Sequence, residues 1–285
     1  MNARNMLGCV GAAVLFFPGL LLSAVKPEKA PVKVAVIGGM TLGGMWPELA
    51  EKFSHDTGWP VELVTTGPKA MLSEAMKGGT VDLLTMHASD EATELVANGI
   101  CTDMQPWARN EHCIMGPADD PAGIRGMSDG AAALKKIAMS KSSFVDFMGP
   151  GSREVSHRLW KAAEVEPKGD WVLKDESPAP QTVVAFAASK HAYVIVGRIP
   201  ILKGKIPSAG MEVLVQGDPV MRRPYVVMIA DAKKFPASNQ VGARALHAWM
   251  TGKPGQDFLH GYGVRKPDAL PLFFPAMSET AAKTP

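Results

Sequence analysis

Strand-like and helix-like patterns of apolar residues alternate along the first third of the chain. Val32 to Ile37 is a continuous apolar run with one lysine, as in a buried strand of a parallel sheet. Apolar residues at helical spacing follow from Met45 to Asp56, and Gly58 stands where a helix C-cap belongs. Strands are then predicted at 61–64 and 81–86, and helices at 70–76 and 90–97. This alternation predicts an α/β lobe with helices on both faces of a mainly parallel sheet.

A second alternating region follows, made of different residues. Helices are predicted at 131–139, 152–163, 182–189 and 241–250, extended segments at 144–147, 193–196, 211–215 and 225–229, and a last periodic stretch at 256–262. The tail after about Pro267 is rich in Pro, Ala, Ser and Thr, so it is expected to be extended and loosely held at its end. The length of 285 residues leaves room for two small cores.

The segment from Glu111 to Gly126, EHCIMGPADDPAGIRG, ends an apolar run abruptly. Gly116 and Pro117 stop a strand because proline has no N–H to donate to a ladder, and Asp-Asp-Pro at 119–121 supplies turn residues. We interpret this segment as the crossover strand of a two-lobed solute-binding protein. Such a strand leads from one lobe into the other, and the ligand lies between the lobes.

Composition excludes some classes of function. The chain is 46% hydrophobic and 20% charged, as in an ordinary globular protein, and its net charge of +2 gives no basic field for nucleic acid. The sequence has no G-x-S-x-G elbow and no H-E-x-x-H motif, and its scattered Ser, His and Asp residues form no recognisable catalytic set. We therefore expect a binding protein rather than an enzyme, with no cofactor.

The N-terminus has the features of an export signal. Arg4 precedes an apolar run from Met6 to Leu22, and Ser23-Ala24 stands at a plausible cleavage site, so residues 1–24 are predicted to be a signal peptide. The alternative is an uncleaved membrane anchor, although Pro18 and Gly19 interrupt the run. Both alternatives predict that the remainder is exported, to the periplasm or an equivalent compartment.

Three cysteines are present, and Cys9 belongs to the predicted signal peptide. An oxidising compartment allows Cys101 and Cys113 to form a disulfide. The alternatives are two buried thiols or a thiol-based site. The sequence has no C-x-x-C and no clustered Cys/His spacing that would indicate a metal.

Several phrases, in order, resemble the tungstate-type solute-binding proteins of ABC transporters. They are FSHDTG (53–58), TTGPKA (65–70), MHA (86–88), the stretch 113–126, PKGDW (167–171), GDP (217–219), PY (224–225) and YGV (262–264). The resemblance covers about 32–264. It implies a type II periplasmic binding protein fold, with lobe one at 31–110 and 222–267, lobe two at 111–221, two chain crossovers, and an extended tail at 268–285.

The resemblance also implies a function. Such a protein closes its lobes on a small anion, such as tungstate or molybdate, and delivers it to the permease of an ABC transporter. The alternative is a sensory or accessory protein that docks onto a membrane sensor or a periplasmic enzyme. We expect a monomer in either case.

The ligand is expected in the cleft, held by backbone N–H groups at helix N-termini and by side-chain donors. The glycine-rich loop after the first strand is a candidate anion nest, and its alternative is an ordinary strand-to-helix turn. A threonine pair matches a family ligand loop but can equally bond its own backbone. Two arginines are candidates for an oxyanion or for salt bridges. The candidate residues are Gly38, Gly39, Met40, Thr41, Thr65, Thr66, Gly67, Gly149, Gly151, Ser152, Arg153 and Arg198.

Two loops depart from the family pattern. Residues 37–40 read Ile-Gly-Gly-Met where the family has a hydroxyl-rich run, and 147–153 lack the family's paired aspartates and Ser-Gly-Thr. A changed ligand is therefore an open alternative to tungstate. Met40, Met45 and Met148 are expected to be apolar lining, and His87 and His112 to be structural, since neither histidine has a partner at metal-site spacing.

Overall fold

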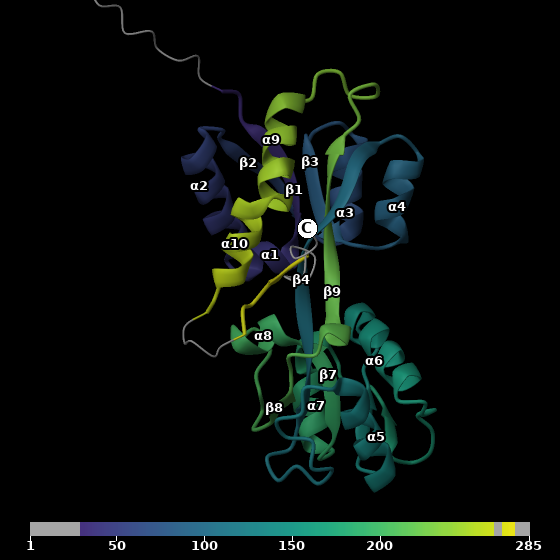
Figure 1. Ribbon diagram of the computed structural model, residues 1–285. Coiled ribbons are helices and arrows are strands. Elements are labelled where there is room, and N and C mark those ends of the chain that lie inside the picture. The colour runs from purple at the N-terminus through teal and green to yellow at the C-terminus, as the bar shows by residue number, and fades with distance from the viewer. Residues whose placement is uncertain (1–28, 265–269, 277–285) are drawn as a thin grey trace, which may run out of the picture.

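The computed structural model describes residues 29–264 and 270–276. The predicted signal peptide or anchor, Cys9 and the remaining tail residues lie outside these ranges. Two lobes lie one above the other in Figure 1, joined by the long strands β4 (Cys101–Gly116) and β9 (Arg222–Ala230). No helix within the described ranges is both long and apolar enough to span a membrane.

Lobe one is a sheet with the strand order β2-β1-β3-β9-β4. The first three strands pair in parallel, and β9 is antiparallel to both β3 and β4. Its elements are β1 (Val32–Ile37), β2 (Val61–Gly67), β3 (Leu83–His87), α1 (Gly38–Leu42), α2 (Met45–Thr57), α3 (Lys69–Lys77), α4 (Asp90–Ala97), α9 (Gln240–Thr251) and α10 (Lys253–Gly261). The predicted C-cap at Gly58 is confirmed, since this glycine has φ +72° and its N–H bonds the Ser54 carbonyl.

Lobe two continues the same sheet through the second half of β4 and then β7, β5 and β6, with β8 also pairing β4. Its elements are α5 (Gly130–Ser140), β5 (Phe144–Asp146), α6 (Pro150–Ala162), β6 (Val172–Lys174), α7 (Val183–Ser189), β7 (Tyr193–Gly197), α8 (Arg198–Leu202), β8 (Glu212–Val215) and 3₁₀ turns at Pro180–Thr182 and Pro219–Met221. The predicted fold class, a two-lobed α/β protein with two crossovers, is confirmed.

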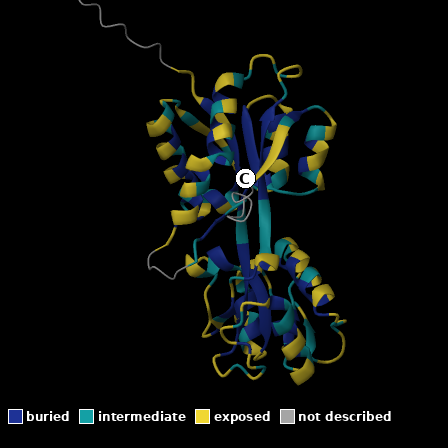
Figure 2. Cartoon of the chain, viewed as in Figure 1, coloured by how far each residue is buried: buried dark blue, intermediate teal, exposed yellow. Residues whose placement is uncertain are grey.

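Each lobe has its own core, as Figure 2 shows by the dark-blue sheets. Trp46, Phe53 and Met228 belong to the lobe-one cluster. Lobe two has one cluster around Phe144 and Trp160 and another that contains Val194. The chain therefore buries apolar surface in two places, with a ribbon of two strands between them.

The crossover strand is longer than its apolar pattern indicates. β4 pairs with β9 from Cys101 to Glu111, and from His112 onward it pairs with β7. Its N-terminal half includes exposed polar residues, so no alternation of apolar positions marks it as a strand. The predicted end at Gly116-Pro117 agrees with the structure.

Residues 270–276 of the tail pack firmly against lobe one. Phe274 and Pro275 form β10, which pairs with β4 at Arg109 and Ala108. Leu272 and Phe273 are buried, and Phe273 is fully enclosed in the lobe-one core. Residues 270–276 are therefore held firmly, because three consecutive large apolar residues outweigh the surrounding Pro and Ala. The end of the tail, which is expected to be loosely held, lies outside the described residues.

The two described cysteines are free, so the disulfide alternative is wrong. Cys101 and Cys113 lie on the same strand, twelve positions apart. At about 3.3 Å per residue they are separated by tens of ångströms, whereas a disulfide needs Cα atoms within about 7 Å. Both are buried, and burial raises the pKa of each thiol to about 12, which also argues against a reactive thiol.

The cleft between the lobes as candidate ligand site

Strand register gathers five polar side chains on one face of the ribbon that joins the lobes. Asn110 and His112 lie on β4 two residues apart, so their side chains point to the same face. On β9, Arg223 pairs with Asn110 and Tyr225 with His87 of β3. The His87 and Tyr225 rings are stacked with centroids 4.1 Å apart. We call this side of the ribbon the cleft face.

The first wall of the cleft comes from lobe one, where two predicted ligand loops meet. A Cβ on Gly38 would lie 3.6 Å from the Cα of Gly67, so these loops touch through their glycines. The hydroxyls of Thr41 and Thr66 are hydrogen-bonded at 2.8 Å. Thr41 also donates to the Gly38 carbonyl at 2.9 Å. The threonine hydroxyls are therefore engaged with the loops themselves.

The remaining lobe-one candidates divide between cleft and core. Gly39 is exposed and faces the Tyr225 hydroxyl, 3.8 Å from where its Cβ would stand. Met40 is fully buried in the lobe-one core, so its side chain does not line the cleft. Thr65 lies within β2 and pairs with Ala35 of β1. The segment 38–40 is itself the start of helix α1 rather than a turn before a helix.

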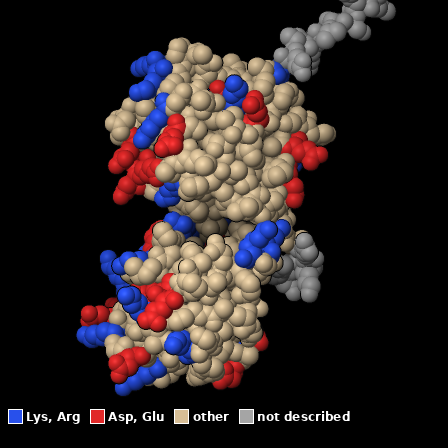
Figure 3. Space-filling model, turned by 180° about the vertical axis from the view of Figure 1, so that it is seen from behind, with Lys and Arg blue, Asp and Glu red and all other residues tan. Residues whose placement is uncertain are grey.

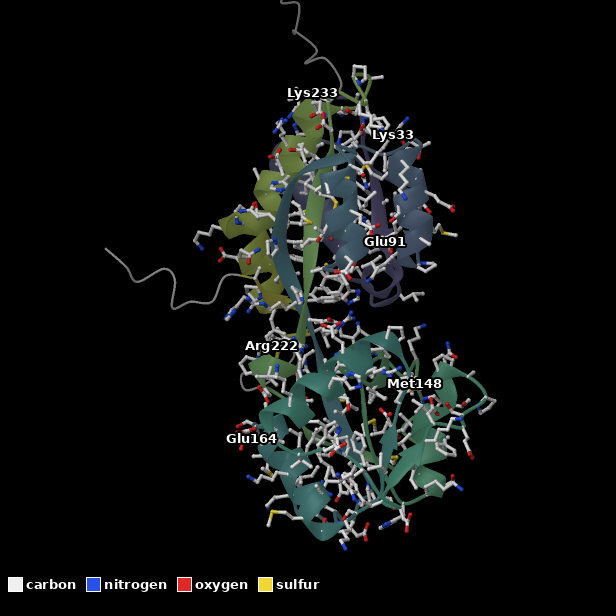
Figure 4. All side chains as sticks on the ribbon, turned by 90° about the vertical axis from the view of Figure 1, so that its right-hand side faces the viewer. Lys33, Glu91, Met148, Glu164, Arg222 and Lys233 are labelled. Carbon is white, nitrogen blue, oxygen red and sulfur yellow. The ribbon has the colours of Figure 1, made fainter. Side chains whose placement is uncertain are left out.

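The second wall is the first turn of α6 in lobe two. Gly149, Gly151 and Ser152 line a cavity of about 350 Å³ together with His112 and Lys205. The first N–H groups of a helix have no partner within it, and they carry partial positive charge. This end of α6 can therefore receive an anion. Met148, beside this turn, lies at the edge of lobe two that faces lobe one (Figure 4) and is half exposed, as expected for apolar lining.

Glycine is needed at position 151. A Cβ there would lie 2.8 Å from Nη1 of Arg223 and 3.2 Å from Nε2 of His112. Either distance is too short for a relaxed contact, so a larger residue would displace groups of the cleft face. Arg223 is 11% exposed and bonds Glu154 of α6 at 2.8 Å.

The two arginines predicted from the sequence lie elsewhere. Arg153 belongs to the first turn of α6 but is exposed, and neither it nor Arg223 is among the residues that line the cavity there. Arg198 is 3% exposed, and its guanidinium donates to Gln216 and to the backbone carbonyls of Leu270 and Pro271. These contacts use its donors on the protein itself, so the prediction of Arg198 as a ligand residue is wrong.

A second cavity of about 260 Å³ extends the cleft between α1 and α8. It is closed by both lobes, because a Cβ on Gly43 would lie 3.6 Å from the Ile199 side chain. Its lining residues are Gly39, Leu42, Gly43, His87, Asn110, Gly197, Ile199, Pro200, Lys203, Lys205 and Tyr225. Pro200 and Lys205 line both cavities, which are therefore neighbouring parts of one cleft.

Three polar atoms of the cleft face have no hydrogen-bond partner among the described residues. They are His87 Nε2, Asn110 Oδ1 and His112 Nδ1, none of which makes a hydrogen bond of normal geometry there. His87 nevertheless lies near Asn110, and His112 near the Met221 backbone, so that both neighbours oppose the fall of the histidine pKa. An unpartnered buried polar atom costs about 1–3 kcal/mol, so three together need an explanation. This cluster was not predicted from the sequence, from which both histidines were expected to be structural. A weak signal was present in Asn110 and His112, two polar residues at strand spacing just before an apolar run.

The electrostatics of the cleft favour negative charge. Neither cavity is lined by Asp or Glu, whereas Lys205 lines both cavities and Lys203 lines the second. Burial, reinforced by Arg223, lowers the pKa of His87 and of His112 to about 3, so both rings are neutral near pH 7. Figure 3 shows the hollowed waist between the lobes with basic side chains beside it.

Two α/β lobes joined by crossover strands, with a polar cleft between them, define a solute-binding protein. The closure of such lobes brings groups from both walls onto one ligand. More particularly, the chain belongs to the family of bacterial extracellular solute-binding proteins, whose model matches residues 33–265.

Known members resemble the chain over most of its length. The tungstate-binding protein TupA of Peptoclostridium acidaminophilum is 28% identical over 287 residues, which cover 95% of this chain and 98% of that protein. The structure of the tungstate-binding protein TupA from Desulfovibrio alaskensis G20 has a TM-score of 0.72 and 26% identity, covering 87% of this chain and 100% of that one. The structure of the tungstate ABC transporter from Geobacter sulfurreducens has a TM-score of 0.65 and 26% identity, and the match covers 81% of this chain and 98% of that one.

Proposed function

We propose that this protein captures a small oxyanion in the cleft and delivers it to an ABC transporter. Tungstate and molybdate are the first candidates, because relatives over nearly the whole chain are named for tungstate. The observation that carries the proposal is the set of unpartnered polar atoms of His87, Asn110 and His112 beside the Arg223 guanidinium. A bound oxyanion would accept hydrogen bonds from the Arg223 guanidinium, from an N–H of each imidazole ring and from the side-chain amide N–H of Asn110, whose Oδ1 is itself an acceptor.

The two walls support an anion in different ways. In lobe two, the first turn of α6 offers backbone N–H groups at Gly151 and Ser152. In lobe one, the glycines of α1 let a ligand approach the backbone closely, since no side chain stands in the way. Contacts from both walls at once would select the closed arrangement of the lobes.

The family membership supports a place of action outside the cytoplasm, and we propose the periplasm. The partner is then a membrane permease that receives the anion from the closed protein. The protein would act as a monomer without a cofactor, and we propose no catalytic role. Whether residues 1–24 are cleaved or retained as an anchor decides whether it diffuses freely.

A thermal-shift screen tests the proposal. The exported chain would be mixed with tungstate, molybdate, sulfate, phosphate, arsenite, small carboxylates and Cu(I), because ligand binding to the folded state raises the melting temperature. At least one oxyanion should raise it in a saturable way, with carboxylates and Cu(I) far weaker. Stabilisation by Cu(I) alone, or by none of these compounds, would refute the proposal.

A further inference from the structure

His87 and His112 of the cleft face have buried ring nitrogens without a partner in residues 29–264 and 270–276. His112 is 4% exposed, its Nδ1 is unpartnered, and its Nε2 lies beside Gly151 at the first turn of α6. His87 Nε2 is likewise unpartnered, and this ring is fixed in orientation by stacking on Tyr225. Both side chains line the cleft, so both are placed to meet a bound ligand.

The charged groups that face these rings are mainly basic. They come from every neighbouring element: Lys69 of α3, Arg158 of α6, Arg223 of β9, and Lys203 and Lys205 at and after the end of α8. The Glu154 carboxylate of α6 is bonded through its Oε2 to Arg223. Glu111 adjoins His112 in sequence but points to the opposite face, where it pairs with Arg198 and Arg222.

We infer that His87 and His112 take up protons from solvent when the oxyanion binds, so that two imidazolium rings and Arg223 together hold a ligand of charge −2. This inference rests on the proposed function and names the class of anion that the cleft prefers. Each ring would then donate an N–H to the ligand through a nitrogen that has no partner in the empty cleft. Monocarboxylates carry half the charge and would be held less well.

The sign of the pH dependence follows from the two states. In the empty cleft, burial and Arg223 hold the pKa of both histidines at about 3, so both are neutral at physiological pH. A dianion beside the rings favours the protonated form and raises the pKa. The affinity gained in this way is present at low pH and is lost as the pH rises through the pKa of the bound state.

Calorimetric titration of the wild-type exported chain tests the inference. Tungstate, molybdate and sulfate are the probes, because they remain dianions between about pH 6 and pH 8, where the histidines would change charge. For each proton taken up, the affinity should rise about tenfold for every unit by which the pH falls. At constant pH, the apparent binding enthalpy should differ between HEPES and Tris, since the buffer supplies the protons.

Variants assign the protons to the two rings. His87→Gln with His112→Gln should flatten the pH dependence, while His157→Gln, at an exposed histidine of α6, should leave it unchanged. If the double variant does not fold, the wild-type buffer comparison still decides. If the affinity is the same across this pH range and the enthalpy is equal in both buffers, the inference about the histidines is overturned and the proposed function is not. Failure to bind any oxyanion at any pH overturns the proposed function as well.

Discussion

The crossover strand β4 has two faces, and the fold treats the polar residues on them differently. On the cleft face, Asn110 and His112 keep buried atoms without partners in the described structure. On the opposite face, Glu111 is fully buried between two arginines, with its Oε1 3.3 Å from Arg222 and its Oε2, which makes no hydrogen bond within the described residues, 3.7 Å from Arg198. A shift of one residue along the strand thus separates a polar cluster without a compensating ion pair from a buried carboxylate that two arginines compensate.

The opposite face joins three parts of the chain. Arg198 comes from the end of β7 in lobe two, and it also holds the tail through the carbonyls of Leu270 and Pro271, at 3.0 and 2.8 Å. The Arg222 guanidinium lies 3.6 Å from the centre of the Phe274 ring. Figure 4 shows Arg222 at the junction of the lobes. Lobe two, the ribbon and the tail are therefore linked behind the cleft.

In our proposal, stability and recognition therefore occupy separate faces of one ribbon. Burial raises the pKa of Glu111, although Arg198 and Arg222 both oppose the rise. Such a group is tolerated only where its partners are fixed, as they are behind the cleft. The cleft face instead leaves its partners to a ligand. Changes on the two faces should therefore separate into losses of folding and losses of binding.

The largest effect is expected behind the cleft. Arg198→Met keeps an unbranched apolar side chain but leaves Glu111 with one arginine and frees two tail carbonyls. Breaking a buried pair in this way costs about 3–5 kcal/mol of unfolding free energy. Urea denaturation would measure it, with Arg125→Met in the exposed pair with Glu212 as the control. Equal stability of the two variants would contradict the ionic role of this face.

A large loss of binding is expected from Arg223→Gln on the cleft face. Removing a charged hydrogen-bond donor should weaken oxyanion affinity by about 2–3 kcal/mol, or roughly 30- to 150-fold. Calorimetric titration would measure this loss. Arg244→Gln is the matched control, because Arg244 also bonds a carboxylate, Asp103, at 2.8 Å, in a separate cavity that Gln105 and His247 line.

Arg153→Ala adds a direct test of the arginine predicted from the sequence. Because Arg153 is exposed, this variant should bind the oxyanion nearly as well as the wild type. If it loses as much affinity as Arg223→Gln, the sequence prediction is right and the assignment to Arg223 is incomplete.

Asn110→Ala should separate the stability of the fold from the affinity for the oxyanion most clearly. Its Oδ1 has no partner among the described residues, so removal should change the unfolding free energy by less than about 1 kcal/mol. Affinity for the oxyanion should nevertheless fall severalfold, because the side-chain amide N–H of Asn110 would donate to the anion. Thermal melting with and without the anion would measure both. A variant that melts much lower without ligand, yet binds normally, would show that Asn110 is structural.

The smallest effect concerns the thiols. Because Cys101 and Cys113 are free and far apart on β4, a reductant should leave the melting temperature unchanged. Intact mass under non-reducing conditions should match two free thiols in the exported chain. A mass lower by two hydrogens would contradict the strand assignment of at least one cysteine.

Much of the fold could be predicted from local patterns. Val32 to Ile37 and Met45 to Asp56 have the apolar periods of a strand and a helix, and Gly-Pro at 116–117 stops a strand in any context. The exposed half of β4 could not be predicted, because its strand state depends on pairing with β9. The firm packing of residues 270–276 was not predicted for a similar reason, because Phe273 is buried by residues that are distant in sequence.

The candidate site was predicted in part. The glycine loops at 38–39, 67 and 149–151 lie in the cleft walls, since loops at strand ends meet there. The polar cluster of the cleft face was not predicted, because it depends on the register of three strands that are far apart in sequence. Arg198 and Arg223 cannot be told apart by residue type, and only their contacts in the structure show that Arg198 lies behind the cleft and Arg223 beside Gly151.

The most direct test of the central claim is a crystal structure of the exported chain grown with tungstate, located by the anomalous scattering of tungsten. The account predicts a single strong peak in the cleft, with oxygens in hydrogen-bond contact with Arg223, His112 and the first turn of α6. A peak confined to the molecular surface, or one in the cleft that leaves the atoms of the cleft face unpartnered, would contradict it.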